Sequence, residues 1–279
     1  MQNIYFKDRQ NFENVLEKIK QDGLEKLYIL SDFDRTLTKS FVNGKKKAGI
    51  ISVLRNGDYL TPEYRQKARE MFDHYRPFEL DVNISKKERN KKMLEWWSTH
   101  KEILIDVGLK KEDIKNAIQE SEIRLREKIK SFLEFLSQQN IPLVIISASG
   151  IGYDAIGFFL EKEKLLTPNI YIISNKFFWD ENSVAIGYDK KIIHSFNKHE
   201  QVPSDYPEMY EKVKTRKNVI LLGDSLGDPD MIEGFEHDNL LKIGFLNEKE
   251  DESLEVYKEK YDVVLTGDGE GEFVDELLR

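Results

Sequence analysis

Residues 27–38 read Leu-Tyr-Ile-Leu-Ser-Asp-Phe-Asp-Arg-Thr-Leu-Thr, an apolar strand pattern that ends in two closely spaced carboxylates. Side chains alternate along an extended chain, so Asp32 and Asp34 lie on the same side with only Phe33 between them. Like charges this close destabilise a fold unless a cation or a shared proton relieves their repulsion. An isolated Asp-x-Asp pair is most often part of a turn, so a metal site here depends on the rest of the chain.

Three more polar clusters follow along the chain, and two of them come directly after strand patterns. The apolar run 141–146 ends in Ser-Ala-Ser-Gly at 147–150, and the run 218–222 ends in the acidic segment 223–228. The cluster Phe-Asn-Lys-His occupies residues 196–199. Ligands of open parallel sheets bind beyond the carboxyl ends of the strands, so all four clusters are expected to converge there.

The order of strand and helix patterns predicts an α/β fold with a doubly wound, Rossmann-like parallel sheet. About a hundred residues between the first two strands show helical spacing of apolar residues, notably in 88–104 and 114–136. An insertion of this length is too long for a loop. We therefore expect a core domain of residues 1–45 and 128–279 and a helical cap domain of residues 46–127 that can close over the site.

Local patterns add further expectations. Residues 11–21 are amphipathic and predict a helix before the first strand, and residues near 229–233 predict another. Turn residues within apolar flanks predict hairpins at 41–44 and 177–186. The charged run 247–260 is typical of a solvated helix face rather than a binding site.

Composition excludes several classes of protein. With 51 acidic and 43 basic residues the net charge is −8, which argues against a nucleic-acid partner. There is no cysteine, hence no disulfide or thiolate zinc site. We find neither a signal-peptide pattern nor an apolar run long enough to span a bilayer, so we expect a cytoplasmic protein without a membrane partner. Composition leaves the oligomeric state open.

The four clusters, in this order over most of the chain, resemble the motifs of the haloacid dehalogenase superfamily of phosphotransferases. The resemblance implies that Asp32 is the nucleophile, that Asp34 is the general acid and base, and that a small phosphate ester is the substrate. A carboxylate nucleophile divides hydrolysis into formation and breakdown of an aspartyl-phosphate. The expected phosphate-binding residues are Thr36, Ser147, Ala148, Ser149 and Lys198.

The same resemblance implies Mg²⁺ as cofactor, because oxygen ligands from few carboxylates suit this hard cation. The expected ligands are the Asp32 carboxylate, the backbone carbonyl of Asp34 and the Asp224 carboxylate, with Asp228 supporting them from nearby. Lys198 is expected to balance the phosphate charge and to keep Asp32 ionised.

Segments 193–199, 220–228 and 241–247 further resemble the cytosolic 5′-nucleotidase III family of pyrimidine nucleotidases. In that family a cap glutamate recognises the base and a cap aromatic residue stacks on it. Glu79 and Trp97 match these positions, which implies a nucleoside 5′-monophosphate as substrate. Stacking on a base contributes about 1–3 kcal/mol. The alternatives are that Trp96 or Trp97 is simply core of the cap and that Glu79 caps a turn.

Two departures from the family leave the base preference open. The loop at 147–150 has one residue more than the family's Ser-Ala-Gly loop, which makes Ser149 a candidate extra donor. The family's second cap serine falls near Thr99 or His100, where this chain has no serine.

Two other functions fit the same fold, because fold does not determine function. A phosphatase of the phosphoserine type, acting on a non-nucleotide metabolite, also carries a helical cap at this insertion point. A cap pocket in which Trp97 does not face the active site would favour it. The chain could also be a binding or regulatory domain, which turnover of any phosphate ester would exclude.

Overall fold

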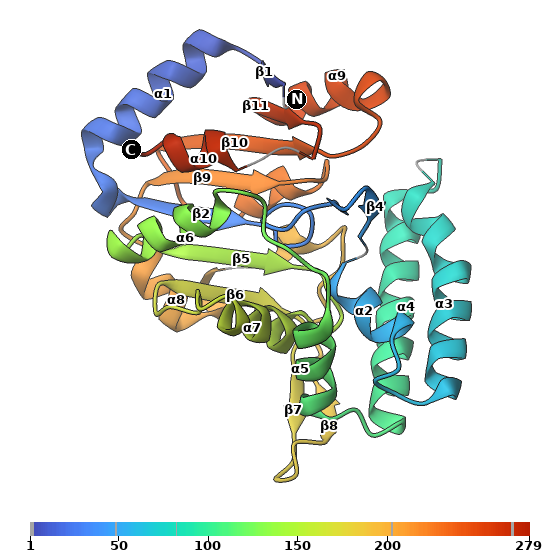
Figure 1. The fold of residues 1–279 in the computed structure, drawn as a ribbon. Helices are drawn as coiled ribbons and strands as arrows, with labels where there is room; N and C mark the ends of the chain where they lie inside the picture. Colours follow the sequence, from blue (N-terminus) through green and yellow to red (C-terminus); the bar gives the residue numbers. More distant parts are fainter. Residues whose placement is uncertain (1–2, 48, 82, 202, 269–270) are drawn as a thin grey trace.

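A seven-stranded sheet forms the centre of the computed structural model (Figure 1). The structure describes residues 3–47, 49–81, 83–201, 203–268 and 271–279. The strand order is β1-β11-β10-β9-β2-β5-β6, and every neighbouring pair is parallel except β1 and β11. The strands are β1 (Ile4–Phe6), β2 (Leu27–Ser31), β5 (Leu143–Ser147), β6 (Ile170–Ser174), β9 (Asn218–Gly223), β10 (Asn239–Leu246) and β11 (Val263–Thr266). The predicted parallel α/β sheet is confirmed, whereas no pattern predicted the three-residue strand β1.

The central strands β2, β5 and β9 are buried along their whole length. Parallel sheets covered on both faces are built from continuous apolar runs, which is why these strands were readable in the sequence. Alternate residues enter two separate hydrophobic clusters. Ile29 and Ile145 belong to the larger cluster, and Leu30 and Val144 belong to the smaller one on the opposite face.

Helices cover both faces, as a doubly wound fold requires. Three of these helices pack into the larger cluster through Phe12, Phe132 and Phe159, and another packs into the smaller cluster through Met209. The covering helices are α1 (Arg9–Asp22), α6 (Ile129–Gln138), α7 (Gly152–Lys162) and α10 (Glu272–Glu276) on the first face, and α8 (Pro207–Val213) and α9 (Glu250–Lys260) on the second.

Between β2 and α6, the described residues form a small hairpin and four helices. Helices α3 and α4 lie side by side beyond the carboxyl ends of the strands (Figure 1). Thr61 and Ser85 cap their first turns, since each hydroxyl accepts a backbone N–H three residues on. The elements are β3 (Phe41–Val42), β4 (Lys45–Lys46), α2 (Ile50–Asn56), α3 (Pro62–Leu80), α4 (Lys86–Asp106) and α5 (Lys111–Glu120).

The insertion has a small hydrophobic cluster of its own between α3 and α4. Tyr75, Met93 and Trp96 form it. Leu54 of α2 and Ile118 of α5 instead belong to the larger cluster of the core. The division into a core and a cap domain at residues 46–127 stays a prediction.

The segment 114–136, whose apolar residues have helical spacing, is not one continuous helix, because the structure has two helices, α5 and α6, with an extended segment between them. Thr38 and Leu125 form an antiparallel bridge, and Arg126 N–H donates to Leu37 O at 3.0 Å. These backbone bonds to the segment after β2 replace helical ones, so tertiary pairing overrides the local propensity.

Of the remaining local predictions, the two hairpins are confirmed and one helix is not. Both hairpins are confirmed, β3–β4 with Asn43 and Gly44 at positive φ and β7 (Phe177–Trp179) with β8 (Ala185–Tyr188). The predicted helix near 229–233 is instead a five-residue 3₁₀ helix, η4 (Asp228–Ile232), followed by Gly234 at φ 83°. Of the described helices, none is both long and apolar enough to cross a membrane.

Candidate active site

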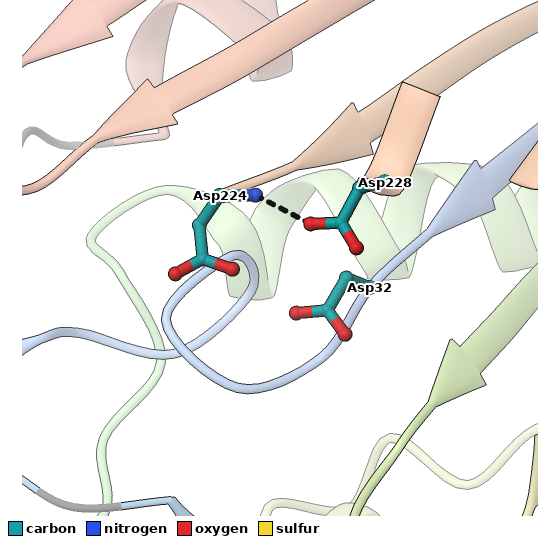
Figure 2. A group of neighbouring side chains, drawn as sticks. All are labelled: Asp32, Asp224 and Asp228. Atoms are coloured by element: carbon teal, nitrogen blue, oxygen red, sulfur yellow. Dashed lines mark hydrogen bonds between the residues drawn. The ribbon is translucent and has the colours of Figure 1, made fainter. Parts of the chain in front are cut away.

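Three carboxylates meet where β2 and β9 end. Asp32 follows β2, Asp224 follows β9, and Asp228 begins η4 (Figure 2). Each offers a carboxylate oxygen, and these atoms all lie within 4.8 Å of one another. The two strands are adjacent in the sheet, so the chain brings together acidic residues that are about 190 positions apart in the sequence.

Asp228 is held rigidly by the loop after β9. Its Oδ2 accepts the backbone N–H of Asp224 at 3.0 Å (Figure 2). The same oxygen accepts the backbone N–H of Ser225 at 2.9 Å. A side chain at Gly223 would collide with Asp228, so glycine is required at this close approach. The other oxygen, Oδ1, accepts from Lys198 at 2.8 Å. Asp228 therefore organises the cluster.

Lys198 lies in η2 (Lys198–Glu200) and is buried between two of the carboxylates. Its Nζ forms ion pairs with Asp32 and Asp228. Burial alone would lower the pKa of Lys198, but the charges of Asp228 and Asp32 raise that pKa well above its ordinary value. The lysine is therefore a fixed cation at this position.

One ammonium cannot neutralise three carboxylates. Burial raises the pKa of Asp32 to about 7, against the lowering effect of Lys198. Burial, followed by repulsion from Asp32 and Asp228, raises the pKa of Asp224 well above its ordinary value. A cluster of carboxylate oxygens with excess negative charge fits a hard divalent cation such as Mg²⁺.

Asp34 lies at the start of the insertion, outside the group of three carboxylates. Its Oδ1 accepts the backbone N–H of Ile50, the first residue of α2, at 3.1 Å. Burial raises the pKa of Asp34, while the Ile50 N–H lowers it. A raised pKa suits a general acid, because the proton must be present before it is given away.

A cavity of about 900 Å³, the active-site cavity, lies between the strand ends and the helices of the insertion. Its lining includes the predicted site residues Asp32, Asp34, Glu79, Trp97, Ser147, Ala148, Ser149, Lys198 and Asp224. Thr36 and Asp228 are outside this lining. Thr36 is fully buried and its hydroxyl donates to Asp32 Oδ2 at 3.2 Å, so it orients Asp32 rather than facing the cavity.

The loop after β5 presents donors to the same cavity. Ser147 Oγ accepts the backbone N–H of Ser149 at 3.2 Å, which closes a tight turn. The hydroxyl of Ser149 is buried and has no hydrogen-bond partner within the described residues. A buried hydroxyl without a partner destabilises a fold, so Ser149 is a candidate donor to a bound molecule.

Trp97 projects from α4 to this loop. Its ring lies nearly parallel to the rings of Trp96 and His100, with centroids 5.2 and 5.7 Å away. A side chain at Gly150 would collide with the indole. Trp97 is thus both a packed aromatic residue and part of the cavity wall.

Glu79 connects the last turn of α3 to the core. Its Oε1 accepts from the hydroxyl of Ser195 at 2.6 Å, and its Oε2 forms an ion pair with Arg76. Ser195 lies three residues before Lys198, so Glu79 contacts the loop that carries the site's cation.

Several residues that support the site carried no recognisable sequence signal. The buried Arg126 donates to Thr36 O at 2.8 Å and so holds the loop that carries Asp32. Tyr257 donates to Asp224 O at 2.6 Å, although it belongs to the charged run that indicated only a solvated helix face. Helix α9 has no fully buried residue, so that expectation describes its exposed side but misses the tyrosine.

The sequence patterns also gave no signal for Asn175, which lies immediately after β6. Its Nδ2 donates to Ser149 O at 3.0 Å and to Ile193 O at 2.8 Å, and its Oδ1 accepts the N–H of Ile193 at 3.0 Å. It therefore joins the loop after β5 to the segment that leads to Lys198. Only a spatial arrangement reveals this role, because the joined segments are distant in sequence.

Comparison with known proteins identifies relatives over nearly the whole chain. The family model described as Pyrimidine 5′-nucleotidase (UMPH-1) matches residues 35–279. A 7-methylguanosine phosphate-specific 5′-nucleotidase of Mus musculus is 35% identical over 268 residues, covering 96% of this chain and 88% of that protein. Another relative, 7-methylguanosine phosphate-specific 5′-nucleotidase A of Xenopus laevis, is 33% identical and covers 99% and 94%.

The fold agrees with these sequence relationships. The crystal structure of cytosolic 5′-nucleotidase IIIB bound to cytidine superposes with a TM-score of 0.90 at 27% identity, covering 99% of this chain and 92% of that one. This likeness confirms the predicted haloacid dehalogenase type of fold.

Proposed function

This chain belongs to the pyrimidine 5′-nucleotidase family, and we propose that it is a magnesium-dependent phosphatase that hydrolyses nucleoside 5′-monophosphates through an aspartyl-phosphate. Membership of this family makes a phosphoric monoester hydrolase the expected class of enzyme. One observation carries the proposal. Asp32 and Asp224, which follow the ends of two adjacent strands, line the same cavity as Glu79 and Trp97.

Asp32 is the nucleophile of the proposed reaction. Its carboxylate oxygen attacks phosphorus, and the bond from phosphorus to the ribose 5′-oxygen breaks as the aspartyl-phosphate forms. Lys198, paired with Asp32, opposes the rise in the pKa of this carboxyl and balances charge on the phosphate. Thr36 orients the second carboxylate oxygen.

Asp34 moves the protons. Protonated Asp34 gives its proton to the leaving 5′-oxygen in the first step and, as a carboxylate, takes one from the attacking water in the second. Phosphate then leaves and Asp32 is regenerated. The raised pKa of Asp34 and its place in the cavity lining support this assignment.

The residues present fit a magnesium site. Asp32, Asp224 and the backbone carbonyl of Asp34 would hold the ion, with Asp228 fixing their arrangement. When bound, the ion supplies positive charge that neutralises the phosphoryl oxygens during transfer. The phosphate itself would be held by Lys198, the hydroxyls of Ser147 and Ser149, and the backbone N–H of Ala148.

The cap side of the cavity supports a nucleoside over a smaller metabolite. Trp97 offers an aromatic surface at the cavity wall, and Glu79 offers a carboxylate acceptor near it. Cavities of this size match ligands larger than phosphoserine. The relatives' names refer to 7-methylguanosine phosphate, and the solved relative binds cytidine, which supports a nucleotide here as well. The expectations of a cytoplasmic location and of no nucleic-acid partner stay predictions.

Phosphate release from a substrate panel tests the proposal. The panel contains nucleoside monophosphates, phosphoserine, sugar phosphates and an aryl phosphate, each with and without Mg²⁺. We expect magnesium-dependent turnover with a clear preference for one or more nucleoside monophosphates. Turnover confined to phosphoserine, a sugar phosphate or the aryl phosphate would retain the catalytic core and contradict the nucleotidase assignment.

A further inference from the structure

Arg55 of α2 lies in the wall of the active-site cavity, yet it is 8% exposed. Its guanidinium stacks over the ring of Phe72, with Cζ 4.0 Å from the ring centroid. Its Nη2 donates to Ser52 Oγ at 2.9 Å. Among the residues that the structure describes, no carboxylate forms an ion pair with it.

The charge of Asp73 attracts Arg55, but not as an ion pair. A buried charge that lacks an ion pair is unusual, because proteins normally pair such groups or neutralise them. Burial lowers the pKa of Arg55, but a guanidinium still stays charged at neutral pH. Ser52 uses one of its five N–H donors, and the planar fork leaves others for acceptors on a bound molecule. The side chain is thus positioned and charged but incompletely satisfied.

The cavity around Arg55 carries an excess of positive charge. Arg76 and Arg89 line it as well, and the carboxylate on this side, Glu79, is already paired with Arg76. The neighbouring His100 adds no charge to this part of the cavity. Burial and then the charge of Arg55 lower the pKa of His100 to about 3, so its ring is neutral. An uncharged group with acceptor atoms therefore fits this end of the cavity better than a cation.

We propose that Arg55 is a base-binding residue that donates to the carbonyl and ring-nitrogen acceptors of an uncharged base and selects against a cationic one. The inference rests on the proposed function, since it concerns the same cavity. Cytosine and uracil offer such acceptors. In 7-methylguanine the methyl group blocks the N7 acceptor, which arginine commonly pairs together with O6, and leaves the ring positively charged at mildly acidic pH. This protein would then prefer other bases than the 7-methylguanosine after which the relatives are named.

The test compares kcat/KM for CMP, UMP, GMP and 7-methyl-GMP at mildly acidic pH. GMP controls for base size, because it differs from 7-methyl-GMP only by the methyl group and its charge. The wild-type protein is expected to favour CMP and UMP over 7-methyl-GMP. Arg55→Gln should lose about 10- to 100-fold for CMP and UMP, mostly through KM, as expected for hydrogen bonds to a charged group, and much less for 7-methyl-GMP.

Two further variants sharpen the comparison. Arg55→Lys keeps the charge but not the planar fork, so it should still disfavour 7-methyl-GMP relative to GMP while losing pyrimidine efficiency. Lys67→Gln removes an exposed cation from neighbouring α3, outside the cavity lining, and should change none of the four values. Calorimetry compares the affinities for cytidine and 7-methylguanosine without turnover, and Arg55→Gln should weaken the binding of cytidine more than that of 7-methylguanosine. Thermal melts verify that each variant is folded.

The inference fails if the wild-type protein prefers 7-methyl-GMP, or if Arg55→Gln lowers all four values by one factor. A different failure is also recognisable. Turnover of an aryl phosphate with none of the four nucleotides hydrolysed would overturn the proposed function, and the role of Arg55 with it.

Discussion

The ammonium of Lys101 donates to the amide oxygen of Asn175 at 2.7 Å, and Lys101 is fully buried. This bond joins helix α4 to the residue that ties the Ser149 loop to the segment before Lys198. Trp97, one turn earlier on α4, packs against the same loop at Gly150. The carboxyl half of α4 is therefore part of the scaffold that positions the proposed phosphate site, in addition to its role in the cavity wall.

Replacement of Lys101 tests this scaffold. Lys101→Met removes one of the two buried donors to the oxygen of Asn175, the other being the N–H of Ile193, so we expect kcat to fall about tenfold for nucleotides and for an aryl phosphate alike. Lys101→Arg should recover part of the loss. A change confined to KM for nucleotides would contradict a positioning role and place Lys101 in base binding.

The same residue predicts a pH dependence of stability. Burial lowers the pKa of Lys101 to about 7, so between about pH 7 and its ordinary value of 10.5 the unfolded chain binds more protons at this site than the folded one. The contribution of Lys101 to the free energy of unfolding therefore rises with pH across that window. Wild-type protein should gain stability relative to Lys101→Met as pH rises from 7 to 10. A difference that is constant with pH would be inconsistent with the lowered pKa.

Asp32→Asn should abolish phosphate release, by about 1000-fold or more, because the nucleophile is lost. The folded-state pKa of Asp32 is raised, so ionisation of this group costs stability as pH rises from about 4 to 7. In the presence of a chelator the variant is therefore expected to melt no lower than wild type at neutral pH, and this advantage should disappear near pH 4. Retained turnover would remove Asp32 from the nucleophile role.

Chelation should silence the enzyme reversibly, with Mg²⁺ restoring it. Bound metal also stabilises the folded state, by about 2.7 kcal/mol at a concentration one hundred times its Kd. Asp224→Asn should abolish this metal-dependent rise in Tm. Asp230→Asn is the matched control, since Asp230 lies in the same segment but outside the carboxylate group, and it should keep the rise. Turnover that persists without metal would contradict the assignment.

Trp97→Ala should raise KM for nucleotides by about 5- to 150-fold, the equivalent of a lost stacking interaction, with little effect on an aryl phosphate. Trp97→Phe keeps an aromatic face and should be milder. Because the indole also packs on the Ser149 loop, the aryl phosphate is the essential control. An equal rise in KM for both kinds of substrate would mean that Trp97 is chiefly structural.

The polar clusters at strand ends were readable because each follows a fully buried, continuous apolar run. The parallel sheet then brings such ends together by topology, which places Asp32, Asp224 and Ser147 in one cavity. The break between α5 and α6 was not readable. There the backbone bridge between Thr38 and Leu125 decides the structure. The spacing of apolar residues within a segment cannot indicate a partner so distant in sequence.

The sequence alone determined the α/β class, the order of the motifs and the candidate residues proposed for phosphate chemistry, since these depend on local apolar periodicity and on which side chains follow each strand. Tertiary structure alone decided that Thr36 orients Asp32, that Asp228 is held by backbone N–H groups, and that Lys101 and Asn175 brace the phosphate loop. It also decided that Arg55 is buried in the cavity wall without an ion pair to any carboxylate that the structure describes. Such roles depend on desolvation and on contacts between distant segments, and neither exists until the chain is folded.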